Sequence, residues 1–284
     1  MSMQVVSDPW ETQSIVSSMR MNGWIVGCVP TMGALHEGHA SLIEQARNEC
    51  NFVVATIFVN PTQFGPNEDF TKYPRTLEAD LEVCRKAGAD LVFTPTAEVM
   101  YPQSAQTIVR VNQMSSVLEG AHRPGHFDGV TTVVAKLLNI TQPHNAYFGQ
   151  KDFQQQLIIR RMVSDLNMPV QIITCPIVRE ADGLAMSSRN RYLSASDRKT
   201  AAEISAALRL AETLSRDSTL APQEIAAEMS AHLTRQPGIE LQYAVVCNAD
   251  TLEPLQHRGT DAVALIAVRV GTTRLIDNCR LSLC

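Results

Sequence analysis

Two histidines, His36 and His39, lie three residues apart where a predicted strand gives way to a predicted helix. The strand is the apolar run of residues 24–29, and Leu42 and Ala46 recur at helical spacing beyond the histidines. A strand, a glycine turn and a helix start bring free backbone N–H groups and a positive dipole end to one place, where phosphate groups bind. Both imidazoles lie on one side of the helix and can donate to the same anion. The spacing therefore predicts a nucleotide triphosphate site.

Two other interpretations of this histidine pair stay open. A His-x-x-His pair could supply half of a zinc site, although no third Cys, His or acidic ligand follows at zinc spacing. It is not the His-Glu-x-x-His motif, because the second histidine comes one residue early. Both histidines could also be ordinary cap residues on a surface helix.

A second polar segment follows the apolar run of residues 52–59. Asn60 and Gln63 supply neutral donors and acceptors there, which suit hydroxyl and carboxylate groups. Taken alone, the segment could equally be a proline-broken turn whose amides face solvent.

Two later segments add positive charge. Residues 149–155 form another glycine turn before a helix, and Lys151 could place a point charge on phosphate. Residues 182–190 combine adjacent serines with Arg189, a natural phosphate clamp. A loop lysine is usually solvated, and a hydroxyl-rich segment can be a linker. Charged groups at three strand-to-helix junctions nonetheless favour convergence on one polyanion.

The order of the predicted elements supplies a scaffold for these segments. Helical and extended runs alternate up to residue 178, which is typical of a doubly wound parallel sheet with its site at the carboxyl ends of the strands. The predicted helices span residues 10–22, 36–48, 77–86, 130–138, 153–166, 196–215 and 222–234, and the predicted strands span 24–29, 52–59, 91–93, 145–148, 170–178, 240–246, 262–270 and 273–276. We expect an α/β fold, Rossmann-like over residues 1–186, with a smaller C-terminal α/β domain over 187–284.

Composition excludes several classes of protein. A formal net charge of −5 without a basic tract disfavours a general nucleic-acid binder. The longest apolar runs fall well short of the roughly 20 residues of a membrane span. Seven scattered cysteines, an odd number without a C-x-x-C pair, are typical of a reducing compartment. We therefore expect a cytoplasmic protein that binds neither nucleic acid nor membrane.

Six motifs, in order, resemble those of the pantoate–β-alanine ligase family, which belongs to the HxGH nucleotidyltransferase superfamily. They occupy residues 30–39, 58–64, 73–76, 122–127, 149–155 and 186–193, with a further echo at 273–278. A lone His-x-Gly-His would be weak support, whereas six ordered motifs are specific. The resemblance implies a ligase that uses ATP to convert pantoate to pantoyl adenylate, releasing pyrophosphate. β-Alanine then displaces AMP to give pantothenate.

The resemblance also implies a role for each matching residue. His39, as proton donor, and His36, Lys151 and Arg189 would be catalytic. Gln63 would bind both pantoate and β-alanine, and Gln155 would bind pantoate. The ATP site would comprise Met32, Gly33, Ala34, Leu35, His36, Glu37, Gly38, His39, Gly149, Gln150, Lys151, Asp152, Val178, Met186, Ser187, Ser188 and Arg189.

Further expectations concern the metal and the assembly. Mg²⁺ should accompany ATP, and Asp80 matches a metal-contacting acid, although Ala79 stands where some relatives carry a second aspartate. The resemblance implies a homodimer and a C-terminal domain that closes as a lid. Two rivals stay open: another nucleotidyltransferase that releases an adenylylated product such as a dinucleotide, and a regulatory protein that binds nucleotide without turnover.

Overall fold

The computed structural model describes residues 2–66, 68–259 and 261–283, and it forms two compact units. The first comprises Met1–Gly149 and Gln154–Pro176, and the second comprises Gln150–Phe153 and Ile177–Cys284. The expected boundary after residue 186 falls inside the second unit. Leu184 explains the difference, because its side chain is 2% exposed and packs in the core of that unit.

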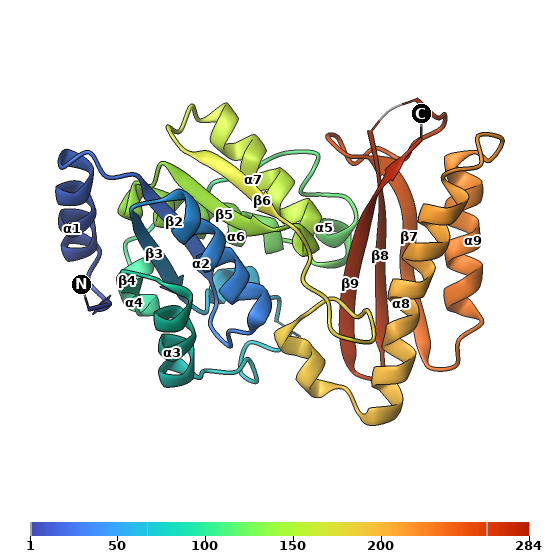
Figure 1. Ribbon diagram of the computed structural model, residues 1–284, viewed down its shortest axis with the longest axis horizontal. Helices are drawn as coiled ribbons and strands as arrows, with labels where there is room; N and C mark the ends of the chain where they lie inside the picture. Colours follow the sequence, from blue (N-terminus) through green and yellow to red (C-terminus); the bar gives the residue numbers. More distant parts are fainter. Residues whose placement is uncertain (1, 67, 260, 284) are drawn as a thin grey trace. The chain divides into compact units, whose positions relative to one another are not determined.

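The first unit is built on a six-stranded parallel sheet in the order β1-β4-β3-β2-β5-β6 (Figure 1). Its strands are β1 (Gln4–Val6), β2 (Val26–Thr31), β3 (Phe52–Ile57), β4 (Leu91–Phe93), β5 (Asn145–Gly149) and β6 (Gln171–Cys175). The chain runs outward from β2 through β3 to β4, then returns to β5 on the other side of β2. The strand order thus reverses between β2 and β5, and ligands of doubly wound sheets bind at such a point. The predicted fold class is confirmed.

Helices cover both faces of this sheet. They are α1 (Pro9–Met21), α2 (Glu37–Glu49), α3 (Leu77–Ala87), α4 (Ala97–Met100), α5 (Glu119–His122), α6 (His126–Thr141) and α7 (Phe153–Asp165). Neighbouring strand residues face opposite ways: Val53 packs in the core formed with α2 and α3, whereas Val54 packs with Val16 of α1. Both faces are covered, so the strands are apolar without alternation.

The second unit carries a three-stranded antiparallel sheet in the order β7-β8-β9. Its elements are α8 (Ala195–Leu214), α9 (Pro222–Thr234), β7 (Ile239–Asn248), β8 (Asp261–Val270) and β9 (Thr273–Ser282). Ile204 of α8, Met229 of α9 and Ile266 of β8 are fully buried in one core. Strand β9 continues six residues past its predicted end at residue 276, so Asp277 and Asn278 lie inside the sheet.

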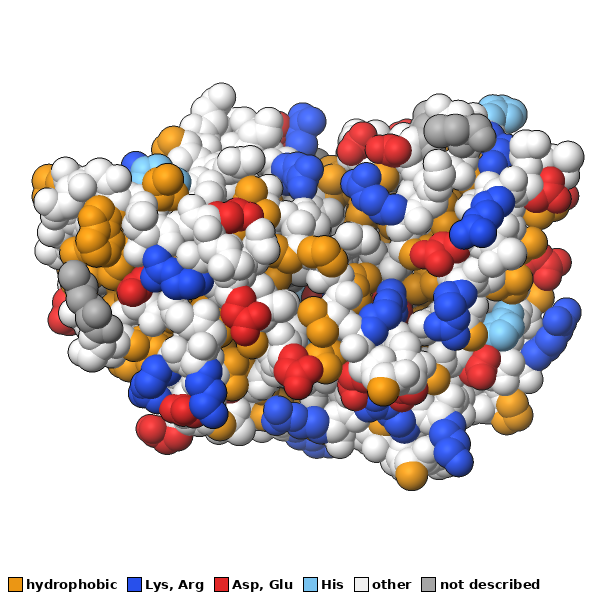
Figure 2. All heavy atoms as spheres, viewed as in Figure 1, with side chains coloured by type: hydrophobic (Ala, Val, Ile, Leu, Met, Phe, Trp, Pro, Cys, Tyr) orange, Lys and Arg blue, Asp and Glu red, His pale blue; other side chains and the backbone are white. Residues whose placement is uncertain are grey.

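The surface charges, the helices and the cysteines of the structure can be compared with the expectations from composition. Figure 2 shows acidic and basic side chains interspersed over the face in view. Within the described ranges, no helix combines the length and apolar character that a membrane crossing requires. The six described cysteines are buried and free, and Cys284 lies outside the described residues.

Candidate functional site

The turn after β2 carries the first group of predicted ATP residues. Gly33 has a φ of +81° and Ala34 a φ of +52°, both in the left-handed region that a residue with a Cβ rarely adopts. A Cβ on Gly33 would come within 3.0 Å of Asp80 Oδ2 and 3.2 Å of a methyl carbon of Ile57. This double left-handed turn lets the chain reverse tightly between the end of β2 and the start of α2.

Asp80 of α3 holds the turn in place. Its Oδ2 accepts a hydrogen bond from the Ala34 N–H (3.0 Å), and its Oδ1 accepts from the Leu35 N–H (2.8 Å) and from Thr76 Oγ1 (3.2 Å). The residue is 2% exposed. The expectation that free N–H groups of this turn face an anion is wrong for Ala34 and Leu35, because Asp80 accepts both of these hydrogen bonds.

The same contacts bear on the predicted metal contact. Both oxygens of Asp80 already accept hydrogen bonds from the chain, and three such bonds occupy most of the acceptor capacity of a carboxyl group. Among the residues that the structure describes, no three His, Cys, Asp or Glu side chains gather as a metal-binding group. Magnesium at Asp80 stays a prediction.

His36 and His39 lie against each other at the start of α2, with ring centroids 4.1 Å apart. His36 Nδ1 accepts from the Gly38 N–H (3.1 Å), and His39 Nδ1 accepts from the His36 N–H (3.3 Å). Because an accepting nitrogen carries no proton, each neutral ring holds its proton on Nε2. The backbone thereby fixes the tautomer in which Nε2 donates, as hydrogen bonding to phosphate requires.

The 3₁₀ turn η1 (Pro61–Gln63), called the Gln63 turn below, lies next to the turn of residues 32–39 within the first unit. Gln63 is 7% exposed; its Nε2 donates to Met32 Sδ (2.9 Å), and its Oε1 accepts from Asn60 Nδ2 (3.0 Å). Asn60 itself is 1% exposed, and its Oδ1 accepts from the Tyr101 hydroxyl (2.9 Å). The structure therefore brings a predicted pantoate residue, Gln63, into contact with a predicted ATP residue, Met32.

Helix α6 fixes the backbone of the Gln63 turn. His126 Nδ1 lies 2.8 Å from the Gln63 carbonyl oxygen and donates to it, so the unprotonated Nε2 accepts from Arg123 Nη1 (3.0 Å). Glu68 in turn accepts two hydrogen bonds from Arg123, at 2.6 and 2.7 Å. Burial and the nearby Arg123 charge lower the pKa of His126 to about 4. His126 is therefore neutral at physiological pH, as this hydrogen-bond pattern requires.

A glycine on α6 allows the closest approach. A Cβ on Gly129 would lie 2.4 Å from the Thr62 carbonyl oxygen and 2.6 Å from the Gln63 nitrogen, so only glycine fits without displacing backbone. The sequence predicted no role for His126 or Gly129. His122 and Arg123, which precede His126 in the same motif, were the available signal for it, and no pattern marks Gly129.

Helix α7 carries three consecutive glutamines with different environments. Gln154 is 4% exposed, and its Nε2 donates to the carbonyl oxygens of Met114 and Val117 (2.7 and 2.8 Å). Gln156 is 3% exposed and accepts from Thr174 Oγ1 (2.9 Å). Gln155, the predicted pantoate residue, is half-buried between these two structural side chains.

The second unit holds the other predicted ATP residues. Lys151 belongs to the short turn η2 (Gln150–Asp152), and its Nζ lies 3.6 Å from Asp152 Oδ2. Val178 and Met186 lie opposite each other, because the Met186 N–H donates to the Val178 carbonyl oxygen (2.9 Å). The structure therefore joins two predicted ATP residues that lie eight positions apart in the sequence.

The segment after Met186 is also held locally. Ser187 caps the 3₁₀ turn η3 (Ser188–Tyr192), where its Oγ accepts from the Arg189 N–H (3.3 Å). Asn190, 8% exposed, donates to the Ala185 carbonyl oxygen (3.1 Å) and to Glu180 (2.7 Å). Ser187, Ser188 and Arg189 are half-buried.

The predicted site residues thus form two groups. Met32 to His39, Gln63, Asp80, Gly149 and Gln155 belong to the first unit, and Gln150 to Asp152, Val178 and Met186 to Arg189 belong to the second.

Comparisons with known proteins agree over nearly the whole chain. A family model described as pantoate-beta-alanine ligase matches residues 4–280. A pantothenate synthetase from Geobacter sulfurreducens is 50% identical over 279 residues, which cover 98% of this chain and 99% of that protein. A pantothenate synthetase from Moorella thermoacetica is 51% identical over 266 residues, which cover 94% of each.

Solved structures also match the chain over nearly its whole length. A pantothenate synthetase from Thermus thermophilus matches with a TM-score of 0.91 at 44% identity, covering 98% of this chain and 99% of that one. A pantoate-beta-alanine ligase from Francisella tularensis, solved with β,γ-ATP and β-alanine, matches with a TM-score of 0.79 at 36% identity, covering 98% and 97%.

Proposed function

We propose a reaction course for this chain from the premise that it belongs to the pantoate–β-alanine ligase family. Its activity is the ATP-dependent joining of pantoate to β-alanine. The observation that carries this conclusion is the family match over residues 4–280, which includes every candidate site residue in both units. The Francisella tularensis relative, solved with β,γ-ATP and β-alanine, supports two of the three substrates.

The proposed reaction has two steps. A pantoate carboxylate oxygen attacks the α-phosphorus of ATP, forming a P–O bond as the bond to pyrophosphate breaks. The β-alanine amine then attacks the acyl carbon of pantoyl adenylate, AMP leaves with the bonding electrons, and the amine loses a proton. Adenylation is needed because a free carboxylate would have to expel oxide. The protein mainly positions the reactants and stabilises phosphate charge.

Residues of the first unit take part in both steps. Nε2–H of His36 and of His39 would donate to phosphate oxygens, a task for which the backbone already sets the tautomer. Their contribution is mainly electrostatic, since a fixed donor stabilises charge that develops during transfer. Gln63 and Gln155 would bind pantoate, and Gln63 would also contact β-alanine. The turn of residues 32–39 and Gly149 would contribute to ATP binding.

Residues of the second unit act on the phosphates. Lys151 and Arg189 supply positive charge, and Ser187 and Ser188 supply hydroxyl donors. Gln150, Asp152, Val178 and Met186 complete the proposed ATP contacts. The same proposal includes Mg²⁺ accompanying ATP and a homodimer, which the family resemblance implies, and residence in the cytoplasm, which the cysteine usage favours.

Exchange of labelled pyrophosphate into ATP tests the proposal, with magnesium present and β-alanine absent. Exchange that requires pantoate is expected, because the first step is reversible and needs no amine. ATP binding without pantoate-dependent exchange would contradict the adenylate, and would favour another acceptor substrate or a regulatory protein. Adding β-alanine should then yield pantothenate and AMP in equal amounts.

A further inference from the structure

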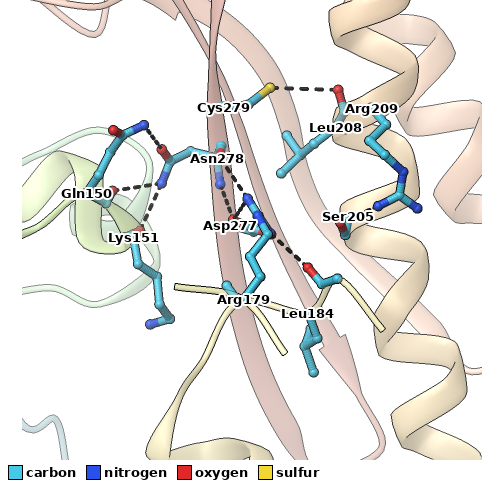
Figure 3. A network of polar contacts seen from close by, with 12 residues as sticks. Gln150, Lys151, Arg179, Leu184, Ser205, Leu208, Arg209, Asp277, Asn278 and Cys279 are labelled. Atoms are coloured by element: carbon cyan, nitrogen blue, oxygen red, sulfur yellow. Dashed lines mark hydrogen bonds and ion pairs between the residues drawn. The ribbon is translucent and has the colours of Figure 1, made fainter. Parts of the chain in front are cut away.

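Strand β9 carries two consecutive buried polar residues. Asp277 is 2% exposed and Asn278 is 1% exposed. Neighbouring residues of a strand point to opposite faces, so the two side chains serve different segments. Figure 3 shows Asp277 directed at Arg179 and Asn278 directed at the turn that carries Lys151. All of these residues belong to the second unit.

Asn278 binds the carbonyl oxygens of the two peptide bonds that flank the Cα of Lys151. Its Nδ2 donates to the Gln150 carbonyl oxygen (3.0 Å) and to the Lys151 carbonyl oxygen (2.9 Å). Its Oδ1 lies 3.4 Å from Gln150 Nε2, which donates to it. Both N–H bonds of the amide and its oxygen are thus used. Two consecutive carbonyl directions are fixed, and with them the direction in which the Lys151 side chain leaves the backbone.

On the opposite face of β9, Asp277 binds the side chain of Arg179. Its oxygens accept from Arg179 Nη1 (2.6 Å) and Nη2 (3.1 Å), and Oδ1 also accepts from the Asn278 N–H (2.8 Å). Arg179 Nη1 donates in addition to the Gly183 carbonyl oxygen (3.0 Å). Arg179 follows Val178, so two neighbouring residues of β9 anchor both the Lys151 turn and the hairpin that pairs Val178 with Met186.

We propose that Asn278 is a positioning residue for Lys151. It touches no reacting atom itself; it fixes the backbone from which the lysine ammonium reaches phosphate oxygens. In Figure 3 the Lys151 side chain extends away from Asn278, as a residue held through its backbone would. The inference rests on the proposed function, because only adenylation gives Lys151 its task.

A double-mutant cycle on pantoate-dependent pyrophosphate exchange tests this inference. The Asn278→Ala change should lower kcat for exchange by about 10- to 100-fold, because a small displacement of a catalytic group is costly. The KM for pantoate should stay unchanged, since Gln63 and Gln155 belong to the first unit. In a Lys151→Ala background, Asn278→Ala should cost no more than about twofold further, because a residue that acts through Lys151 has nothing left to position.

Asn248→Ala is the matched control. Asn248 ends β7 of the same sheet, and its Oδ1 accepts from the N–H groups of Asp250 and Thr251 (2.8 and 3.0 Å). It therefore also fixes a turn, but one without a candidate site residue. Its loss should lower thermal stability and leave kcat unchanged. If Asn278→Ala does not fold, Asn278→Ser, which keeps one donor, should show an intermediate loss.

The outcomes separate the inference from the proposed function. Wild-type protein without pantoate-dependent exchange would overturn the proposed function and the inference with it. If the wild type exchanges normally, three results would each overturn the inference alone. These are additive losses in the cycle, an Asn278 variant that folds and exchanges like wild type, and a Lys151→Ala variant with full activity.

Discussion

At the scale of single residues, His39 carries the sharpest expectation. His39→Ala removes the proposed Nε2 donor together with the acceptor of the His36 N–H. Loss of one preorganised donor should lower the single-turnover rate of adenylation by about 10²–10³-fold. His257→Ala is the control, because His257 is exposed and lies outside the candidate site. A His39→Ala rate within threefold of wild type would refute the assignment.

Also at the scale of single residues, a substitution of Asp80 distinguishes a structural role of its carboxyl group from a metal-binding role. Asp80→Ala leaves the N–H groups of Ala34 and Leu35 without their acceptor in a buried turn. The free energy of unfolding should fall by about 2–4 kcal/mol, the cost of two unsatisfied buried donors. The measurement is denaturant unfolding without magnesium or nucleotide, under which a residue that only bound metal would contribute nothing. An unchanged midpoint would therefore favour the metal role.

At the scale of elements, the contact between α6 and the Gln63 turn leaves no space for an added side-chain atom at Gly129. Gly129→Ala would place a methyl group 2.4 Å from the Thr62 carbonyl oxygen, so helix and turn must separate. The KM for pantoate should rise several-fold and the melting temperature should fall. Gly65→Ala is the control, because its Cβ would meet Glu68 at an ordinary 3.6 Å. Equal effects of the two changes on pantoate would contradict the proposed role of the turn.

The elements also show how far sequence reasoning reaches. Helix α3 ends at Ala87, one residue past its predicted end, and Gly88 caps it with a φ of +96°; such an end can be predicted because capping is local chemistry. Strand β9 extended past its predicted end, because Asp277 and Asn278 are polar and only Arg179 and the Lys151 turn make their burial favourable. Those partners lie about 100 or more residues earlier in the chain, beyond any local pattern.

In the candidate site too, local motifs could be predicted from the sequence and contacts between distant residues could not. The residues predicted to contact substrate were readable from motifs, and the two histidine rings do lie against each other at the start of α2, 4.1 Å apart and tilted by 43°. The residues that hold these side chains and turns in place were not readable from motifs. Asp80 lies more than forty positions from Ala34, and His126 lies sixty-three from Gln63. Nothing in the spacing of such pairs signals contact, so the supporting residues emerge only from the folded chain.

At the scale of the whole molecule, His126 should make stability depend on pH. Burial and the Arg123 charge lower its pKa to about 4, against 6.5 for an unperturbed histidine. Between these values the unfolded chain binds a proton that the folded chain does not, so the free energy of unfolding falls as the pH falls from about 6.5 to about 4. The contribution present above pH 6.5 and lost in this window is about 3 kcal/mol at most.

The variant His126→Asn isolates this contribution from that of the other titrating groups. Its amide can still donate to the Gln63 carbonyl oxygen, as Nδ1 of the histidine does, but it binds no proton. Denaturant unfolding of both proteins from pH 8 to pH 4.5 should show the wild type losing more stability than the variant, with the curves diverging below about pH 6.5. The exposed control His257→Asn should follow the wild-type curve. Parallel curves for wild type and His126→Asn would mean that His126 takes up its proton as readily in the fold as in the unfolded chain. The neutral ring would then not be what holds the Gln63 turn to α6.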